Sequence, residues 1–335
     1  MQLKFLKAGS GDCIIIHHNG VNILVDGGND ETYLFQQIDP IFSSEEFIDL
    51  IIITHHDDDH INGVMKLLHS VIDGKYKERP NFIKRIIFNS TKSITKKTDD
   101  DRTNLSYSQA HIVEQLLFKL NLASESCNNF TTPIPFGDDL TLTFHAPFSE
   151  DLARYVEKDT YYLSSDYRCD WKSPMQSLDQ NLDDDSQDKS LPNKTSIVIT
   201  VECQEKKILL TGDITPDRFQ EIILSLVAIN GGNAVKYDYI KLPHHGSYKS
   251  LNKIILQNVI CKNFIIQTNS SKYYLPNKRA LLKVLKYCPR TNGDRIKFLF
   301  NYPQSITNLG ISNAEKKAYS FELEANNNDY GILIG

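Results

Sequence analysis

A dense group of metal-binding side chains lies between residues 51 and 63, where the sequence reads I-I-I-T-H-H-D-D-D-H-I-N-G. Three histidines and three aspartates occupy the six positions from His55 to His60. Residues 50–53 form a short apolar run typical of a buried strand, and the apolar positions from Ile61 onward have helical spacing. Adjacent carboxylates at a strand end repel one another unless a cation neutralises them. We therefore interpret this segment as a metal site at the carboxyl end of a strand, the edge where α/β proteins bind ligands.

Two further predicted strands end in side chains of the same kind. The run 207–210 leads into Asp213, and the run 237–242 leads into the pair His244 and His245. Two metal ions need about seven protein donors with one bridging carboxylate, and donors from separate strand ends can converge on one point. We therefore predict that these side chains join the first group in a dinuclear site.

The elements that must position these residues alternate between strand and helix patterns. The Asn19-Gly20 pair between two apolar runs predicts a hairpin. We expect strands at 2–6, 13–17, 21–25, 50–53, 83–89, 140–144, 196–202, 207–210, 237–242, 264–268, 297–300 and 319–324, the last two at the edge of a sheet. We expect helices at 31–38, 63–70, 107–122, 216–229 and 279–287. This order predicts an α/β fold.

Composition excludes several classes of protein. The net charge of −5 gives no reason to expect a globally basic nucleic-acid surface, although local basic patches remain possible. The six cysteines are scattered without a C-x-x-C pair, which favours reduced thiols. No signal-peptide pattern or apolar run of ~18 to 20 residues is present, so we expect a soluble cytoplasmic protein with no membrane partner. Residues 155–192 are rich in Ser, Asp, Asn, Gln and Lys, which predicts a long insertion that is mobile or partly disordered.

The 55–60 segment resembles the H-x-H-x-D-H signature of the metallo-β-lactamase superfamily, with Asp57 in place of the second histidine. This variant is similar to the soluble domain of ComEC-type DNA-uptake proteins and to phosphorylcholine esterases, in which H-x-D-x-D-H-x-x-G is typical. Four other motifs of that subgroup occur in the same order: G-S-G-D at 9–12, D-G-G at 26–28, L-T-G-D at 210–213 and P-H-H-G-S at 243–247. The resemblance covers roughly residues 1–300.

The resemblance implies a single domain over residues 1–335 with a four-layer αββα sandwich. It also implies a ligand set, in which His55 and Asp57 hold the first metal, Asp59 and His60 hold the second, Asp213 bridges both, and His245 completes the second site. Asp26, and with it Asp12, would orient the histidine ligands from behind.

Three positions leave alternatives open. His244 could exchange roles with His245. His145 is the one well-placed candidate for a further histidine ligand, and an ordinary hydrogen-bonded histidine is an equal alternative. Leu275 stands before Pro276 where relatives often have a histidine, so the residue for one acid–base role is open.

The function that the resemblance implies is a metal-dependent hydrolase with two Zn²⁺ or Mn²⁺ ions. An activated water would attack phosphorus, with Asp59 among the catalytic ligands and His244 touching a phosphoryl oxygen or the leaving group. The expected substrate is a nucleic acid or nucleotide phosphodiester, with DNA first, as for a nuclease. One alternative is a small-molecule hydrolase acting on a cyclic nucleotide, a phosphocholine-type ester or a lactone. The other is a non-catalytic binding subunit that retains the fold, against which the intact ligand set argues.

Overall fold

The computed structural model describes residues 1–335 except 80, 90–104, 129–132, 156–168, 183–185 and 292. The strands are β1 (Gln2–Leu6), β2 (Ile14–His18), β3 (Val21–Val25), β4 (Leu50–Ile53), β5 (Ile86–Phe88), β6 (Ser124–Glu125), β7 (Ile134–Phe136), β8 (Leu140–Ala146), β9 (Val198–Cys203), β10 (Lys206–Leu210), β11 (Val235–Lys236), β12 (Tyr239–Lys241), β13 (Val259–Ile260), β14 (Asn263–Ile266), β15 (Ile296–Phe300), β16 (Phe321–Glu324) and β17 (Gly331–Ile334). The helices are α1 (Thr32–Ser43), α2 (Asp58–Ile72), α4 (Leu105–Lys119), α5 (Ser149–Tyr155), α6 (Met175–Asp179), α7 (Leu191–Lys194), α8 (Pro216–Ile229), α9 (Lys253–Gln257), α10 (Lys278–Tyr287), α11 (Pro303–Leu309) and α12 (Asn313–Tyr319), with short 3₁₀ turns at His244–Gly246 and Tyr248–Ser250.

Most strands belong to two large sheets. The first has the order β17-β1-β2-β3-β4-β5-β6, and the second has the order β16-β15-β14-β12-β10-β9-β8-β7. In the first sheet β3, β4, β5 and β6 run parallel, and in the second β10, β12, β14, β15 and β16 run parallel. The last strand, β17, pairs with β1, so the two ends of the chain are joined in one sheet. The parallel strands of each sheet direct their carboxyl ends to one edge, which is where α/β folds place ligand sites.

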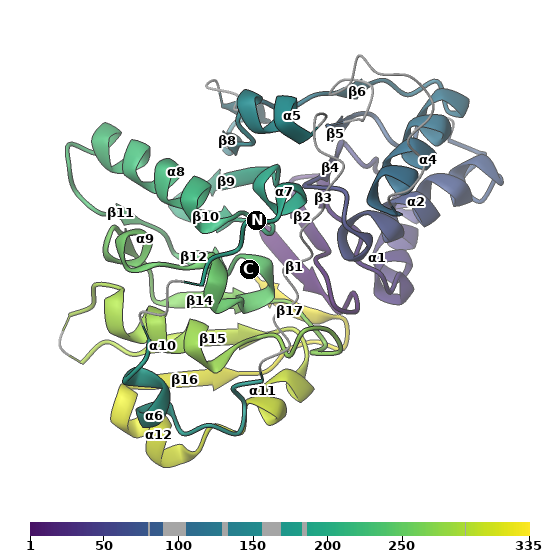
Figure 1. The fold of residues 1–335 in the computed structure, drawn as a ribbon. Coiled ribbons are helices and arrows are strands. Elements are labelled where there is room, and N and C mark those ends of the chain that lie inside the picture. The colour runs from purple at the N-terminus through teal and green to yellow at the C-terminus, as the bar shows by residue number, and fades with distance from the viewer. Residues whose placement is uncertain (80, 90–104, 129–132, 156–168, 183–185, 292) are drawn as a thin grey trace.

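Three apolar clusters divide the molecule into four layers. The middle cluster lies between the sheets and joins Phe5 and Ile16 of the first to Phe144 and Val201 of the second. A second cluster joins the outer face of the first sheet to α1, α2 and α4. The third joins the outer face of the second sheet to α6, α8, α9, α10 and α11, and Figure 1 shows the two sets of helices on opposite sides of the molecule. The predicted four-layer αββα sandwich is thus confirmed.

The predicted strands and helices are confirmed, with ends that differ by a few residues. The hairpin at Asn19-Gly20 joins β2 to β3, and both turn residues have positive φ angles. Helix α1 ends at Ser43 and not at the predicted residue 38, and α2 begins at Asp58 and not at the predicted residue 63. Aspartates are favourable in the first turn of a helix because they interact with its positive end, so the acidic residues are part of α2. Short elements and elements with weak patterns were missed, namely β6, β7, β11, β13, β17, α5, α6, α7, α9, α11 and α12.

Within the segment predicted as an insertion, residues 169–182 and 186–192 are described. Helix α6 packs Met175 and Leu178 into the cluster beneath the second sheet. Residues 156–168 and 183–185 lie outside the described residues, so a mobile insertion stays a prediction, as does the single-domain assignment. In the described part of the chain, every helix is too short or too polar to span a bilayer.

Candidate metal centre

The predicted site residues come from both sheets and meet at the edge where the parallel strands end. Asp26 follows β3 and His55 follows β4, whereas Asp213 follows β10 and His245 follows β12. The first turn of α2 adds Asp59 and its neighbours at this same edge. Strand ends that are distant in the sequence therefore supply one common site.

Glycines allow the backbone of α2 to approach the loops of the first sheet. A Cβ atom on Gly11 would lie 1.6 Å from the carbonyl oxygen of Asp59, and one on Gly63 would lie 2.0 Å from that of Gly27. The N–H of Gly27 donates to the carbonyl of His60 at 2.7 Å. The G-S-G-D and D-G-G motifs thus have a steric reason, because any side chain at these points would displace the first turns of α2.

Asp213 lies at the centre of the cluster. Its Oδ2 atom is 3.5 Å from Nε2 of His60, 3.3 Å from Nε2 of His245 and 4.0 Å from Nε2 of His244. Atoms of Asp12, His60, Asp213 and His245 that could bind a metal all lie within 4.8 Å of one another, and all four residues are buried. The structure therefore contains a buried Asp/His cluster that is able to hold a metal ion.

The remaining predicted ligands border this centre. Nε2 of His55 is 3.8 Å from Oδ2 of Asp57, and the imidazole rings of His55 and His60 are 4.1 Å apart between centroids. On the other side, Oδ2 of Asp59 is 3.7 Å from Nε2 of His245. The six residues predicted as principal ligands thus form one continuous group: His55, Asp57, Asp59, His60, Asp213 and His245.

Several atoms that face the centre lack a well-formed hydrogen bond in the described part of the structure. They are Nε2 of His55, His60 and His245 together with Oδ1 of Asp213, all buried. A buried polar atom without a partner is costly, and imidazole nitrogens with carboxylate oxygens are typical donors to Zn²⁺ and other divalent cations. The residues therefore fit a metal ion by both their chemistry and their unfilled bonding capacity.

The opposite edge of each imidazole is held by the protein. Nδ1 of His60 lies 2.8 Å from Oδ2 of Asp26, which also accepts a hydrogen bond from the Thr54 hydroxyl at 2.6 Å. Nδ1 of His245 lies 3.0 Å from the carbonyl oxygen of Gln267. Such bonds fix a proton on Nδ1 and leave Nε2 available to a metal. Asp26 is thus placed behind His60, as expected from the sequence.

Asp12 also lies behind the rings. Its Oδ1 atom is 3.4 Å from Nδ1 of His245, and its Oδ2 atom is 4.0 Å from Nδ1 of His60. These distances alone would allow Asp12 to bind the same metal ion. Its oxygens, however, face the Nδ1 atoms of the two rings, whereas Asp213 faces their Nε2 atoms. We interpret Asp12 as an orienting carboxylate for this reason.

Electrostatic surroundings favour a cation at the centre. Burial and then the charge of His60 hold the pKa of His55 well below its usual value, so its ring is neutral and able to bind metal. Asp57 is 36% exposed, yet burial and the carboxylates of Asp59 and Asp213 raise its pKa to about 7. Burial alone would raise the pKa of Asp59, but His60 and His245 lower it to about 2. Carboxylates that are crowded in this way gain from a divalent cation between them.

A buried lysine at the site was not predicted. Lys241, at the end of β12, is fully buried, forms an ion pair with Asp12 and donates to the carbonyl of Gly212 at 2.9 Å. Its Nζ atom is also 3.6 Å from Oδ1 of Asp213. Burial would lower the pKa of Lys241, but Asp12 and Asp213 raise it, so the side chain carries a charge. Lys241 lies two residues before the P-H-H-G-S motif, and no pattern in the sequence marks it as part of the site.

His244 occupies a different position from His245. Its Nδ1 atom is 2.9 Å from Oδ2 of Asp188 and 3.3 Å from Nδ2 of Asn193, and its side chain is 18% exposed, against 4% for His245. Both histidines have positive φ angles, 47° and 53°, in the turn after β12. Non-glycine residues hold this conformation at a cost, and such strain concentrates at functional sites. Asp188 lay in the polar segment predicted as an insertion and gave no signal in the sequence.

Three other histidines and aspartates, His56, Asp58 and His145, bond to residues outside the candidate metal centre. Nε2 of His56 lies 2.6 Å from the carbonyl of Asn89, and Asp58 accepts a hydrogen bond from Gln109 of α4. His145 of β8 places its Nε2 2.7 Å from Oγ1 of Thr200. Neighbouring Phe144 faces the core between the sheets, so alternation directs His145 to the opposite face. The structure does not bring His145 together with the described cluster.

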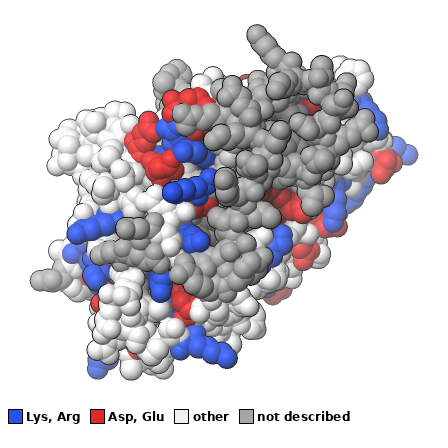
Figure 2. All heavy atoms as spheres, in the orientation of Figure 1, with Lys and Arg blue, Asp and Glu red and all other residues white. Residues whose placement is uncertain are grey.

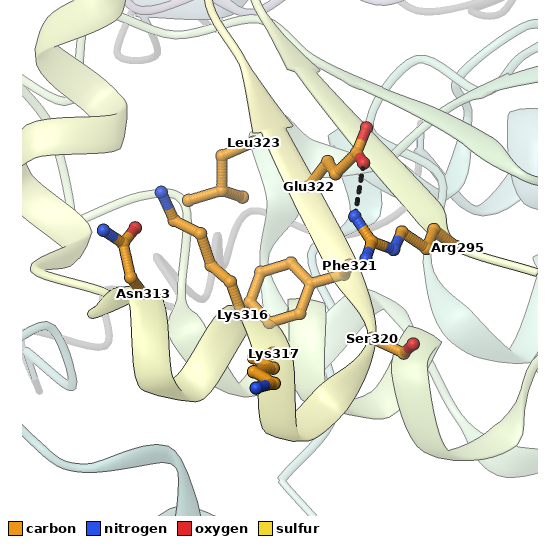
Figure 3. Close-up of a pocket in the computed structure, with 8 residues that line it drawn as sticks. All are labelled: Arg295, Asn313, Lys316, Lys317, Ser320, Phe321, Glu322 and Leu323. Carbon is orange, nitrogen blue, oxygen red and sulfur yellow. Dashed lines mark hydrogen bonds and ion pairs between the residues drawn. The ribbon is translucent and has the colours of Figure 1, made fainter. Parts of the chain in front are cut away.

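The described surface shows mixed charge (Figure 2) and a hollow that lies beside α12 and β16. On the face shown in Figure 2, the described Lys and Arg side chains lie in separate groups with Asp and Glu among them. This hollow is lined by residues including Arg295, Lys316, Lys317 and Phe321. Nη1 of Arg295 is 3.0 Å from Oε1 of Glu322, and Figure 3 marks this ion pair. This lining has no histidine or cysteine and one carboxylate, so it lacks the ligands of a metal site.

Among solved structures, the chain is similar to YhfI from Bacillus subtilis (TM-score 0.45, 10% identity, covering 99% of this chain and 98% of that one). It is also similar to human tRNase Z, short form (0.45, 9%, 100% and 99%), and to Zn²⁺-bound PqqB from Methylobacterium extorquens (0.46, 10%, 100% and 100%). No curated protein sequence is significantly similar to this chain.

The family model described as "Metallo-beta-lactamase superfamily" matches residues 6–82. This match supports the predicted superfamily, whereas the ComEC-type and phosphorylcholine esterase resemblance stays a prediction. The matched segment runs from β1 to beyond α2 and contains His55, Asp57, Asp59 and His60. The part of the chain that is similar to the metallo-β-lactamase superfamily is therefore the part that carries four of the six proposed metal ligands.

Proposed function

We propose that this chain is a metal-dependent hydrolase of the metallo-β-lactamase superfamily that cleaves phosphodiesters, with DNA as the first candidate substrate. The observation that carries the proposal is the convergence on the Asp213 carboxylate of two buried imidazole nitrogens, Nε2 of His60 and Nε2 of His245, that lack a well-formed hydrogen bond. The family match over residues 6–82 supports the same reaction class.

Two divalent cations, Zn²⁺ or Mn²⁺, are proposed to be held by the six-residue group. His55 and Asp57 would hold one, Asp59, His60 and His245 would hold the other, and Asp213 would lie between them, at 3.3 to 3.5 Å from two of the imidazole nitrogens. Such ions lower the pKa of a bound water and neutralise charge on phosphoryl oxygens. Orientation of these ligands comes from Asp26, from Asp12 and from the carbonyl of Gln267.

His244 is the proposed proton donor and charge-stabilising group. Burial alone would lower its pKa, but the carboxylates of Asp213 and Asp188 raise it above its usual value. Asp188 holds Nδ1, so Nε2 is the nitrogen that faces Asp213, at 4.0 Å. A protonated Nε2 in this position can donate to a phosphoryl oxygen or to the leaving group.

Metal analysis and single substitutions test the proposal. Metal-reconstituted protein should contain two equivalents of transition metal and should hydrolyse bis(p-nitrophenyl) phosphate or DNA. Asp59→Ala and Asp213→Ala should abolish hydrolysis. Asp58→Ala is the matched control, because this neighbouring carboxylate bonds to Gln109 and not to the cluster; it should retain metal and rate.

The outcome on a substrate panel separates the alternatives. Cleavage of DNA, RNA or a simple phosphodiester supports the proposal, and cleavage confined to lactones or phosphocholine esters would replace it with a small-molecule hydrolase. Less than half an equivalent of bound metal, with no turnover of any substrate, would point instead to a non-catalytic binding protein. Equal loss of activity in Asp58→Ala and Asp59→Ala would contradict the assigned ligands.

A further inference from the structure

A loop of the second sheet connects the two sides of the candidate metal centre. At its start, the N–H of Asn269 donates to the carbonyl of Gly9 at 2.9 Å, one residue before the Ser10 that donates to Asp59. At its end, the N–H of Asn277 donates to the carbonyl of Gly246 at 3.0 Å, directly after His245. The segment 270–276 is thus fixed at both ends to loops that carry site residues.

Two exposed tyrosines occupy the middle of this loop. Tyr273 and Tyr274 are 41% and 42% exposed, and both have positive φ angles, 54° and 53°. Successive bulky residues in this conformation are unusual and strained. The rings are large apolar surfaces presented to solvent beside a candidate active site, a combination that no requirement of the core explains.

The loop is held in place from behind. The ring of Trp171 packs edge-on against Tyr274, with centroids 5.6 Å apart, and its Nε1 donates to the carbonyl of Pro276 at 2.8 Å. The neighbouring Asp170 accepts from the N–H of Lys278 at 2.8 Å, at the start of α10. These contacts therefore preorganise the ring of Tyr274 and the end of the loop, which lowers the entropic cost of binding a ligand there.

The same loop carries a cation, Lys272. Lys272 directly precedes the two tyrosines and is close enough for its charge to act on Asp59. A lysine and two exposed tyrosines at successive positions of one loop suit a ligand in which an anion adjoins a flat apolar ring. The lysine would repel a quaternary ammonium group, so this arrangement disfavours phosphocholine as the ligand.

We propose that Lys272, Tyr273 and Tyr274 form a nucleobase subsite, in which a base of the substrate stacks on the tyrosines while Lys272 pairs with a neighbouring phosphate. This inference rests on the proposed phosphodiesterase function and adds a substrate class to it, namely nucleotides with an unpaired base. Stacking of bases on aromatic side chains tolerates any sequence, so the subsite recognises single-stranded substrate and not a particular sequence.

Two esters with the same leaving group test the subsite. Thymidine 5′-(p-nitrophenyl phosphate) carries a base, and methyl p-nitrophenyl phosphate does not. Tyr274→Ala should lower kcat/KM for the thymidine ester by about 5-fold to 150-fold, the effect of one lost stacking contact, chiefly through KM, and should leave the methyl ester unchanged. Tyr274→Phe keeps the ring and should retain the wild-type value. Phe118→Ala removes another exposed aromatic residue, on α4 and 88% exposed, and should change neither ester.

Binding without turnover separates the subsite from the reaction. In an Asp213→Asn background, anisotropy of labelled oligothymidylate and of an abasic strand of equal length should show tighter binding of the strand with bases. Tyr274→Ala should abolish that difference. If neither ester is hydrolysed, the proposed phosphodiesterase function fails, and the anisotropy result still decides the subsite. Equal binding of the two strands, with equal effects of Tyr274→Ala on both esters, would overturn the subsite and leave the proposed function intact.

Discussion

The buried Lys241 offers a sharp test of how the candidate metal centre is stabilised. Its ammonium group is the cation that contacts Asp12 and lies 3.6 Å from Asp213, and all three residues are buried. Lys241→Met keeps much of the side-chain volume but leaves the carboxylates without this charge. Removing one partner of a buried ion pair costs about 3–5 kcal/mol, a large part of the total stability of a domain.

The control is Lys207→Met on the neighbouring strand β10. Lys207 pairs with Glu202 at 2.9 Å, but the two side chains are 37% and 42% exposed. Solvent screens such a pair, so the same substitution should cost at most about 1 kcal/mol. Both variants should be compared by urea unfolding of chelator-treated protein followed by circular dichroism, because a bound metal would replace the missing charge.

The double variant Lys241→Met/Asp12→Asn removes both charges of the pair. It should recover much of the stability lost in Lys241→Met, since the cost arises from the unpaired carboxylate. If Lys241→Met alone gives no folded protein, the double variant must fold for this reasoning to hold. Equal costs in Lys241→Met and Lys207→Met, or a double variant less stable than either single change, would show that the ion pair does not balance the site.

Three further predictions concern the metal ligands and the backbone around them. His245→Ala should lower metal content and rate together, whereas His244→Ala should keep both metals and lose rate by ~10² to 10³; elemental analysis with steady-state kinetics would detect the reverse assignment. Chelation should lower the melting temperature, and metal at about 100 times its Kd should restore about 2.7 kcal/mol per site, so equal melting curves with and without metal would count against the site. Gly11→Ala should lower the free energy of unfolding by about 1–3 kcal/mol and weaken metal binding, because the added Cβ would clash with the carbonyl of Asp59. The control is Gly335→Ala, which has open space around the added Cβ and should have the melting temperature of the wild type.

The fold was predictable because its signals are local. Apolar alternation and β-branched runs mark β1 to β4, β9, β10, β12, β14 and β15, and the periodic helices α4, α8 and α10 stand out in the same way. Helix α12 was missed although a capping box of Ser312 and Glu315 marks its start. Its seven residues include no buried one, so apolar periodicity had nothing to detect.

The site was predictable in part for a related reason. Four of its proposed ligands lie in one six-residue segment, and the rest follow strands with recognisable turn motifs. Lys241 gave no such signal, because a lysine in a strand is ordinary until two sheets bury it. Asp188 was hidden in a polar segment whose composition predicts only a solvated loop. Residues that act through distant contacts are visible only when the tertiary structure brings them together.

The site is divided between the two sheets, so the distances between its ligands depend on how the sheets pack against each other. His60 belongs to the first half of the chain and His245 to the second, so their spacing is set by how the sheets pack. Gln267, at the end of β14, joins these halves: its carbonyl faces Nδ1 of His245, and its side-chain amide donates to the carbonyl of Cys13 at 3.1 Å, directly after Asp12. Asn301 makes a second link to the carbonyl of Leu6 at 2.8 Å. Because both amides are fully buried, these hydrogen bonds fix the alignment of the sheets at the edge where the ligands meet.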